Sequence, residues 1–106
     1  MSQCFVYVTA SSAEEAGKIG RALVEARLAA CANVFGAIQS YYWWEGAVQE
    51  DTEAALILKT RSGLVAALTA KVKELHSYDC PCVVALPIEG GNSEFLAWID
   101  AETSAA

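Results

Sequence analysis

The chain has 106 residues, of which 55% are hydrophobic, and 13 acidic residues against 7 basic ones give a net charge of −6. This length predicts one domain, residues 1–106, and the acidity argues against nucleic acid, since phosphate binding needs clustered Lys and Arg. No run approaches the roughly 20 apolar residues of a membrane span, and the N-terminus lacks a secretory signal. We therefore expect a cytoplasmic protein that does not bind membranes, with its four cysteines reduced.

The first half of the chain predicts a strand, a helix and a long hairpin. Phe5–Thr9 is a β-branched and aromatic run typical of a strand. A capping box at Ser12 begins a helix whose apolar residues recur three or four apart, to about Leu28. A long strand is then expected over residues 32–44, followed by a turn and a returning strand over 48–60.

The second half adds a helix, a strand and a last helix. Helical spacing of apolar residues extends from Leu64 to about His76 and stops before Pro81. We expect a short buried strand over Val83–Pro87 and a last helix capped by Asn92. The order βαββαβ plus a C-terminal helix indicates an α+β, ferredoxin-like sandwich.

One face of this sheet is predicted to lack a cover within the chain. Right-handed crossovers place the first two helices on the same face. The residues of the strand over 32–44 alternate between two largely apolar sides. One side is made of Val34, Ile38, Tyr42 and Trp44, and the other of Phe35, Ala37, Tyr41 and Trp43. We expect the bare face to pack against another copy of the chain; the alternative is that the last helix covers it.

Five segments, at the right spacing and in order, resemble the CutA family of divalent-ion-tolerance proteins. They are Val24–Asn33 (VEARLAACAN), Ile38–Gly46 (IQSYYWWEG), His76–Pro81 (HSYDCP), Leu86–Ile88 (LPI) and Phe95–Ile99 (FLAWI). The resemblance extends over residues 6–99. It implies a homotrimer of ferredoxin-like subunits, with high stability and a link to tolerance of copper and other divalent ions.

His76 is the only histidine and is a candidate metal ligand, because imidazole suits copper and zinc. Copper-binding members of the family use a cysteine in the first strand and two adjacent histidines after the second helix. The matching residues here are Val8, Leu75 and His76, so two of the three have no donor atom. The alternative is that His76 caps the last carbonyls of its helix.

Cys80 and Cys82 are the other candidate ligands. Residues two apart in an extended segment point to the same side, so both sulfurs could bind one Cu(I) or Zn ion, with His76 as a third ligand. The alternative is that they are two small buried apolar side chains beside Pro81. Any copper or other divalent cation is expected to bind weakly. The carboxylates near the hairpin are expected to form a charged edge instead of a cation cage.

Two further functions stay open at this point. A trimeric protein of the PII signalling type would bind a nucleotide between subunits, and Lys59 and Arg61 are the basic residues available for it. A plain structural scaffold needs no ligand. No nucleophile motif, phosphate loop or pair of catalytic acids is evident in the sequence, so an enzyme is not expected.

Overall fold

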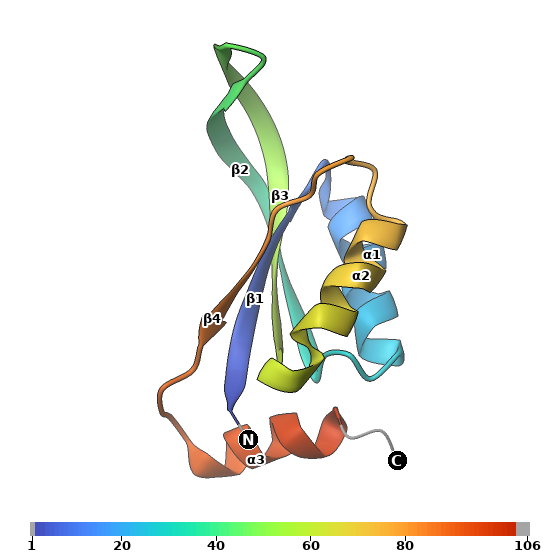
Figure 1. The fold of residues 1–106 in the computed structure, drawn as a ribbon, viewed down its shortest axis with the longest axis vertical. Coiled ribbons are helices and arrows are strands. Elements are labelled where there is room, and N and C mark those ends of the chain that lie inside the picture. The colour runs from blue at the N-terminus through green and yellow to red at the C-terminus, as the bar shows by residue number, and fades with distance from the viewer. Residues whose placement is uncertain (1, 104–106) are drawn as a thin grey trace.

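The computed structural model describes residues 2–103, which form four strands and three α-helices (Figure 1). A single 3-10 turn, Ser62–Leu64, precedes the second helix. The elements in chain order are β1 (Gln3–Ala10), α1 (Ala13–Glu25), β2 (Cys31–Trp44), β3 (Ala47–Arg61), α2 (Val65–Leu75), β4 (Val83–Pro87) and α3 (Ser93–Glu102). The predicted α+β order with its long hairpin and extra helix is confirmed.

The strands form one antiparallel sheet in the order β2-β3-β1-β4, with α1 and α2 together on one face (Figure 1). Alternate residues of the two central strands point at the helices, and β1 pairs with β3 so that Val6 lies opposite Leu58 and Val8 opposite Leu56. These four side chains are fully buried and pack with Ile19, Leu23, Leu68 and Val72 of the helices. The core therefore lies between the sheet and the helix pair, as the crossover rule predicts.

Helix α1 begins where the sequence predicts and ends earlier. At its start, Ser12 Oγ accepts the backbone N–H of Glu15 at 3.1 Å. At its end, Arg27 adopts a left-handed φ of 63°, its N–H donates to Val24 O, and the Leu28 N–H donates to Leu23 O. This pair of bonds is the Schellman motif that glycine usually completes. Because Arg stands at that position instead of glycine, no stop signal is visible there, and the predicted end near Arg27 or Leu28 is about two residues later than the observed end at Glu25.

The prediction of strict alternation along β2 was wrong at one point. Phe35 pairs with Ala55 and Ile38 pairs with Glu53, so β2 carries one extra residue against β3 between them. Such a β-bulge moves every later side chain to the other face. Phe35 therefore shares its face with Ile38, Tyr42 and Trp44, while Val34 points toward the helices.

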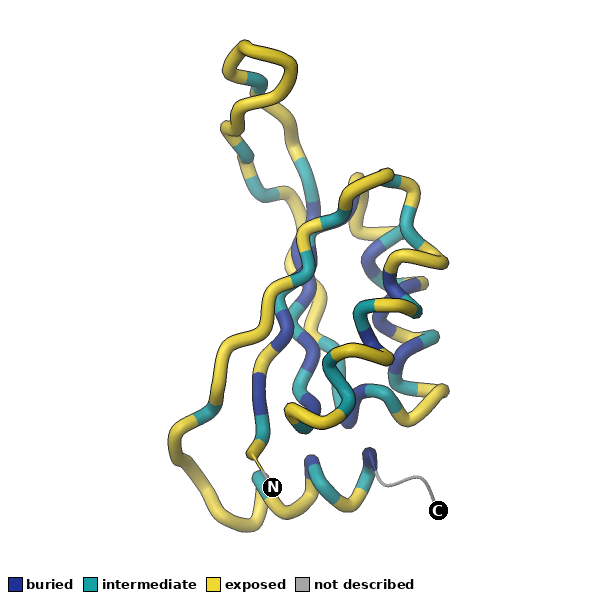
Figure 2. The backbone as a smooth tube through the Cα atoms, in the orientation of Figure 1, coloured by how far each residue is buried: buried dark blue, intermediate teal, exposed yellow. Residues whose placement is uncertain are grey.

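The face of the sheet opposite the helices, hereafter the open face, is largely uncovered (Figure 2). Large apolar side chains lie exposed on it, namely Phe5, Phe35, Tyr42, Trp44, Val84 and Leu86. Helix α3 packs at one end of the sheet, where Gln3 Nε2 donates to Asp100 Oδ2 at 3.0 Å and Arg61 Nη2 donates to Thr103 O at 2.8 Å. The alternative that the last helix covers this face alone is therefore wrong.

Candidate functional site: the groove beside Cys80 and Cys82

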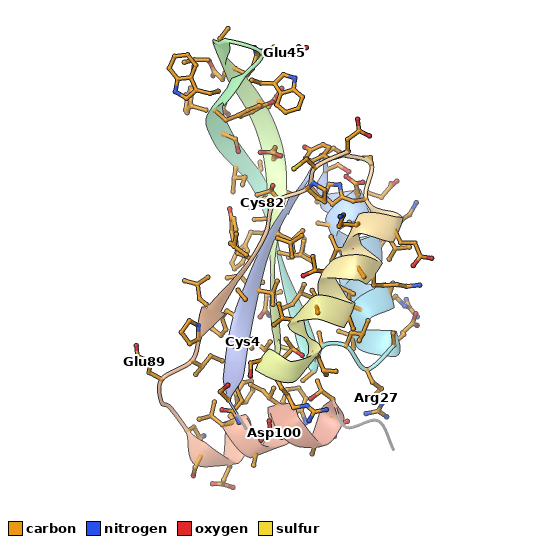
Figure 3. The ribbon with its side chains drawn as sticks, viewed as in Figure 1. Cys4, Arg27, Glu45, Cys82, Glu89 and Asp100 are labelled. Carbon is orange, nitrogen blue, oxygen red and sulfur yellow. The ribbon has the colours of Figure 1, made fainter. Side chains whose placement is uncertain are left out.

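An open groove of about 450 Å³ lies where the hairpin leaves the four-stranded sheet. Strand β1 ends at Ala10, opposite Ala54, and β2 and β3 continue beyond it as a two-stranded ribbon. The segment between α2 and β4 crosses this point, and Cys82 lies on it beside the base of the hairpin (Figure 3). We call this space the hairpin groove; its lining is Thr9, Ser40, Tyr42, Trp44, Asp51 and Glu53 of the sheet, with Tyr78, Asp79, Cys80 and Cys82 of the crossing segment.

His76 holds the start of the crossing segment against β1. Its side chain is fully buried. Nε2 lies 2.7 Å from Thr9 O, and Nδ1 lies 3.0 Å from the Tyr78 backbone nitrogen. Since a backbone N–H donates and a carbonyl accepts, Nδ1 is the acceptor and Nε2 carries the proton that Thr9 O receives. Both ring nitrogens are therefore engaged with backbone, and the ring bonds β1 instead of the last carbonyls of α2.

Glu15 holds the same segment from the other side. Its Oε2 accepts the Ser77 backbone N–H at 2.8 Å, and its Oε1 accepts both the backbone N–H and the hydroxyl of Ser11, at 2.9 and 2.8 Å. Burial raises the pKa of this carboxyl, but the bonds from Ser11 and Ser77 outweigh burial and lower it to about 2. The ionised Glu15 thus ties the crossing segment to the start of α1.

Two phenol–carboxylate pairs line the hairpin groove. The Tyr78 hydroxyl donates to Glu53 Oε2 at 2.7 Å, and the Tyr42 hydroxyl donates to Asp51 Oδ2. Burial and then the bond to Glu53 raise the pKa of Tyr78. The bond to Asp51 is the main reason that the pKa of Tyr42 is also raised. Both phenols therefore stay neutral hydrogen-bond donors at physiological pH.

The structure brings Cys80 and Cys82 to this groove as exposed, free thiols. The alternative that they are buried apolar side chains is therefore wrong. The thiol of Cys82 is still partly shielded from solvent. This partial burial and the nearby Glu53 charge raise its pKa, and hydrogen bonding with Thr9 only partly offsets them. Within residues 2–103, no group of three or more His, Cys, Asp or Glu side chains is arranged to hold a metal ion. A metal site on His76, Cys80 and Cys82 stays a prediction.

The copper ligand set implied by the family resemblance does not fit this chain. Val8 is fully buried in the core, and Leu75 ends α2 as a partly exposed apolar side chain. Neither has an atom that can bind a metal.

Sequence reasoning also missed that Tyr42 and Tyr78 pair with acids of β3. Contacts between such distant residues leave no local spacing signal; the only hint was a tyrosine two residues after the histidine.

Fold and groove together define a small ferredoxin-like α+β protein with a projecting hairpin and a ligand-sized groove at the hairpin's base. The family model for "CutA1 divalent ion tolerance protein" matches residues 4–102. The divalent-cation tolerance protein CutA of Archaeoglobus fulgidus is 52% identical over 96 residues, which are 91% of this chain and 93% of that protein. The chain belongs to the CutA family.

Other relatives agree in sequence and in structure. The chloroplastic protein CutA 1 of Oryza sativa is 48% identical over 98 residues, and the match covers 92% of this chain but 55% of that longer protein. The crystal structure of CutA1 from Oryza sativa matches with a TM-score of 0.96 at 44% identity, over 100% of this chain and 97% of that chain. A CutA structure from Archaeoglobus fulgidus, described as a periplasmic protein, matches with a TM-score of 0.93 at 49% identity, over 96% and 99% of the two chains.

Proposed function

We propose that this CutA protein works as a non-catalytic homotrimer in the cytoplasm, where it binds a soft metal ion through Cys80 and Cys82. The observation that carries the metal site is that two free thiols, two residues apart, lie exposed on one groove. Thiolates select Cu(I) and Zn. Cu(II) binding is expected to be weak, because His76 could ligate only after giving up its bonds with Thr9 and Tyr78.

The open face supports the homotrimer. Its aromatic and aliphatic side chains are exposed in the single chain, with Trp44 at 56% and Leu86 at 53% of full exposure. Monomeric proteins rarely leave contiguous apolar patches of this kind in water. Obligate interfaces often bury more than ~2,000 Å² and are more apolar than transient ones, so the open face is suited to contact another copy.

Chemistry at the groove supports a binding role instead of catalysis. A general base needs a free lone pair near the reacting proton, and both nitrogens of His76 are taken by backbone groups. The matching family model and the Archaeoglobus fulgidus relative are named for tolerance of divalent ions, not for a reaction. No helix among residues 2–103 is long and apolar enough to cross a membrane. All four cysteines are free thiols, and this state favours the reducing cytoplasm.

A nucleotide site of the PII type finds no support in the hairpin groove. The lining includes three carboxylates, Asp51, Glu53 and Asp79, and no Lys, Arg or His. Phosphate groups would be repelled there. Lys59, one of the two basic residues considered for phosphate, instead donates to Asn33 Oδ1 at 2.7 Å between the rings of Phe5 and Phe95.

Calorimetry with Cu(I) under reducing conditions, and separately with Cu(II), tests the metal proposal. We expect the wild-type protein to bind Cu(I), the Cys80→Ser/Cys82→Ser variant to lose this binding, and the Cys31→Ser variant to keep it. Cys31 is a matched control because it is a free thiol of β2 outside the hairpin groove. Equal Cu(I) binding by wild type and the double variant would remove the metal site from the proposal and leave a scaffold role.

A further inference from the structure

Most of the hairpin groove is part of the open face. By strand register, the lining residues that the sheet supplies all lie on the same side as Phe5 and Phe35; they are Thr9, Ser40, Tyr42, Trp44, Asp51 and Glu53. The crossing segment adds the other wall, which carries the free thiols of Cys80 and Cys82. The two thiols therefore lie at the border of the surface that is suited to contact another copy of the chain.

Aromatic rings of the open face lie on both sides of the groove. Phe35 is opposite Ala55 of β3, on the side of the four-stranded sheet. Trp44 is opposite Ala47, toward the tip of the hairpin. The acids of the groove occupy β3 between these two positions, and both rings are exposed in the single chain. A copy of the chain that buries both rings passes over the groove between them and covers the thiols.

We propose that Cu(I) binding by Cys80 and Cys82 is coupled to subunit assembly, each strengthening the other, because a neighbouring copy closes the hairpin groove over the bound ion. This inference rests on the thiolate site and the homotrimer of the proposed function. In one chain the site is incomplete, since among residues 2–103 no three His, Cys, Asp or Glu side chains are arranged to hold a metal ion. The apolar side chains of the neighbour complete it as a shell that excludes water, and such shells control solvent access to bound metals.

The size of the groove favours mutual strengthening over competition. It holds about 450 Å³, whereas one molecule of liquid water takes up about 30 Å³. A neighbouring copy can therefore fill most of the groove without displacing an ion held at the thiols. An ion that binds the assembled protein better stabilises the assembly by mass action, and assembly raises the affinity for the ion by the same factor.

The Leu86→Glu variant tests this coupling without changing the groove. Leu86 is an exposed side chain of the open face that does not line the groove. A charge buried there should separate the subunits and leave both thiols in place. Calorimetry with Cu(I) under reducing conditions should then show about tenfold weaker binding than in the wild type, a factor within the usual range for coupled sites. In the metal-free proteins, alkylation with N-ethylmaleimide followed by mass spectrometry should find Cys80 and Cys82 protected in the wild type and reactive in the variant.

A control and a second variant accompany this measurement. Trp43→Glu places the same charge on the other face of the ribbon, and it should keep the assembly and the Cu(I) affinity of the wild type. Leu86→Ala should weaken assembly without burying a charge. In dilution light scattering, Cu(I) should lower the concentration at which Leu86→Ala dissociates by about tenfold. The same variant with Cys80→Ser/Cys82→Ser added should show no such shift.

The possible results separate the coupling from the proposed function. Equal Cu(I) affinity in Leu86→Glu and wild type, or equal alkylation of their thiols, would overturn the coupling and leave the thiolate site in place. If Leu86→Glu does not fold, the absence of a Cu(I) shift in Leu86→Ala would overturn the coupling by itself. No Cu(I) binding by the wild type would refute the thiolate site and the coupling together.

Discussion

The ionised Glu15 carboxylate should supply a large, pH-dependent share of the stability of this small protein. Its side chain is 17% exposed and accepts three hydrogen bonds, two from Ser11 and one from Ser77. Its pKa falls from an ordinary 4.5 to about 2 on folding. Each step of one in pKa corresponds to about 1.4 kcal/mol. The Glu15→Gln substitution should therefore lower the free energy of unfolding at pH 7 by about 3 kcal/mol.

The pH dependence follows from the direction of that change. A carboxyl whose pKa is lower in the folded state stabilises fully above its unfolded pKa and loses this effect as the pH falls through its folded pKa. The difference between wild type and Glu15→Gln should thus be constant from pH 7 to about 5 and shrink between about 4.5 and about 2. Guanidinium unfolding of both proteins at a series of pH values, at one protein concentration, measures this difference in the free energy of unfolding.

Glu14→Gln is the matched control for this experiment. Glu14 precedes Glu15 in the first turn of α1, but its side chain is 83% exposed and has only a 3.8 Å ion pair with Lys18. Exposed pairs of this kind contribute roughly 0–1 kcal/mol, so the control should change stability little. A difference for Glu15→Gln that is the same at pH 7 and pH 2.5, or a Glu14→Gln effect of equal size, would refute the role given to the three hydrogen bonds.

Four further outcomes are expected. Gly46→Ala should lower the free energy of unfolding by about 1 kcal/mol in denaturant titrations, because Gly46 has a left-handed φ of 78° with nothing within 4 Å of an added Cβ; a neutral result would show that the hairpin turn relaxes freely. His76→Phe should cost about 2–4 kcal/mol by the same method, since two partly buried backbone groups, Thr9 O and the Tyr78 N–H, lose their partners; a loss below ~1 kcal/mol would contradict this. Trp44→Ala should weaken subunit association by about 2–4 kcal/mol in dilution light scattering, far more than Trp43→Glu on the other face; equal effects would contradict the assignment of faces. The raised pKa of Cys82 means that metal binding must displace a proton, so apparent Cu(I) affinity should rise with pH between 6 and 9, and a flat profile would exclude this thiol as a ligand.

The order of elements and the position of the core could be predicted because local patterns determine them. The capping box at Ser12, the helical spacing through Val72 and the β-branched and aromatic run of β1 each depend on residues close in sequence. The bulge after Phe35 could not be predicted, because a one-residue insertion is visible only against the partner strand. The end of α1 was placed too late for a similar reason, since Arg27 adopts a conformation usually left to glycine.

Candidate ligands could be named from the sequence, but their surroundings could not. Cys80 and Cys82 were identified from their spacing and type, and they do lie exposed at one groove. The environment of His76 depends on Thr9, which is 67 positions away, and that of Tyr78 depends on Glu53 across the groove. Such contacts follow from the way the crossing segment passes over the end of β1, which only the tertiary structure determines.

Native mass spectrometry of the reduced protein after addition of Cu(I) tests the proposed function most directly, since it reports subunit number and metal content together. We predict a trimer that carries three Cu(I) ions, and a metal-free trimer for the Cys80→Ser/Cys82→Ser variant. A stable monomer would contradict the proposed homotrimer. The same copper content in the variant as in wild type would contradict the proposed thiolate site.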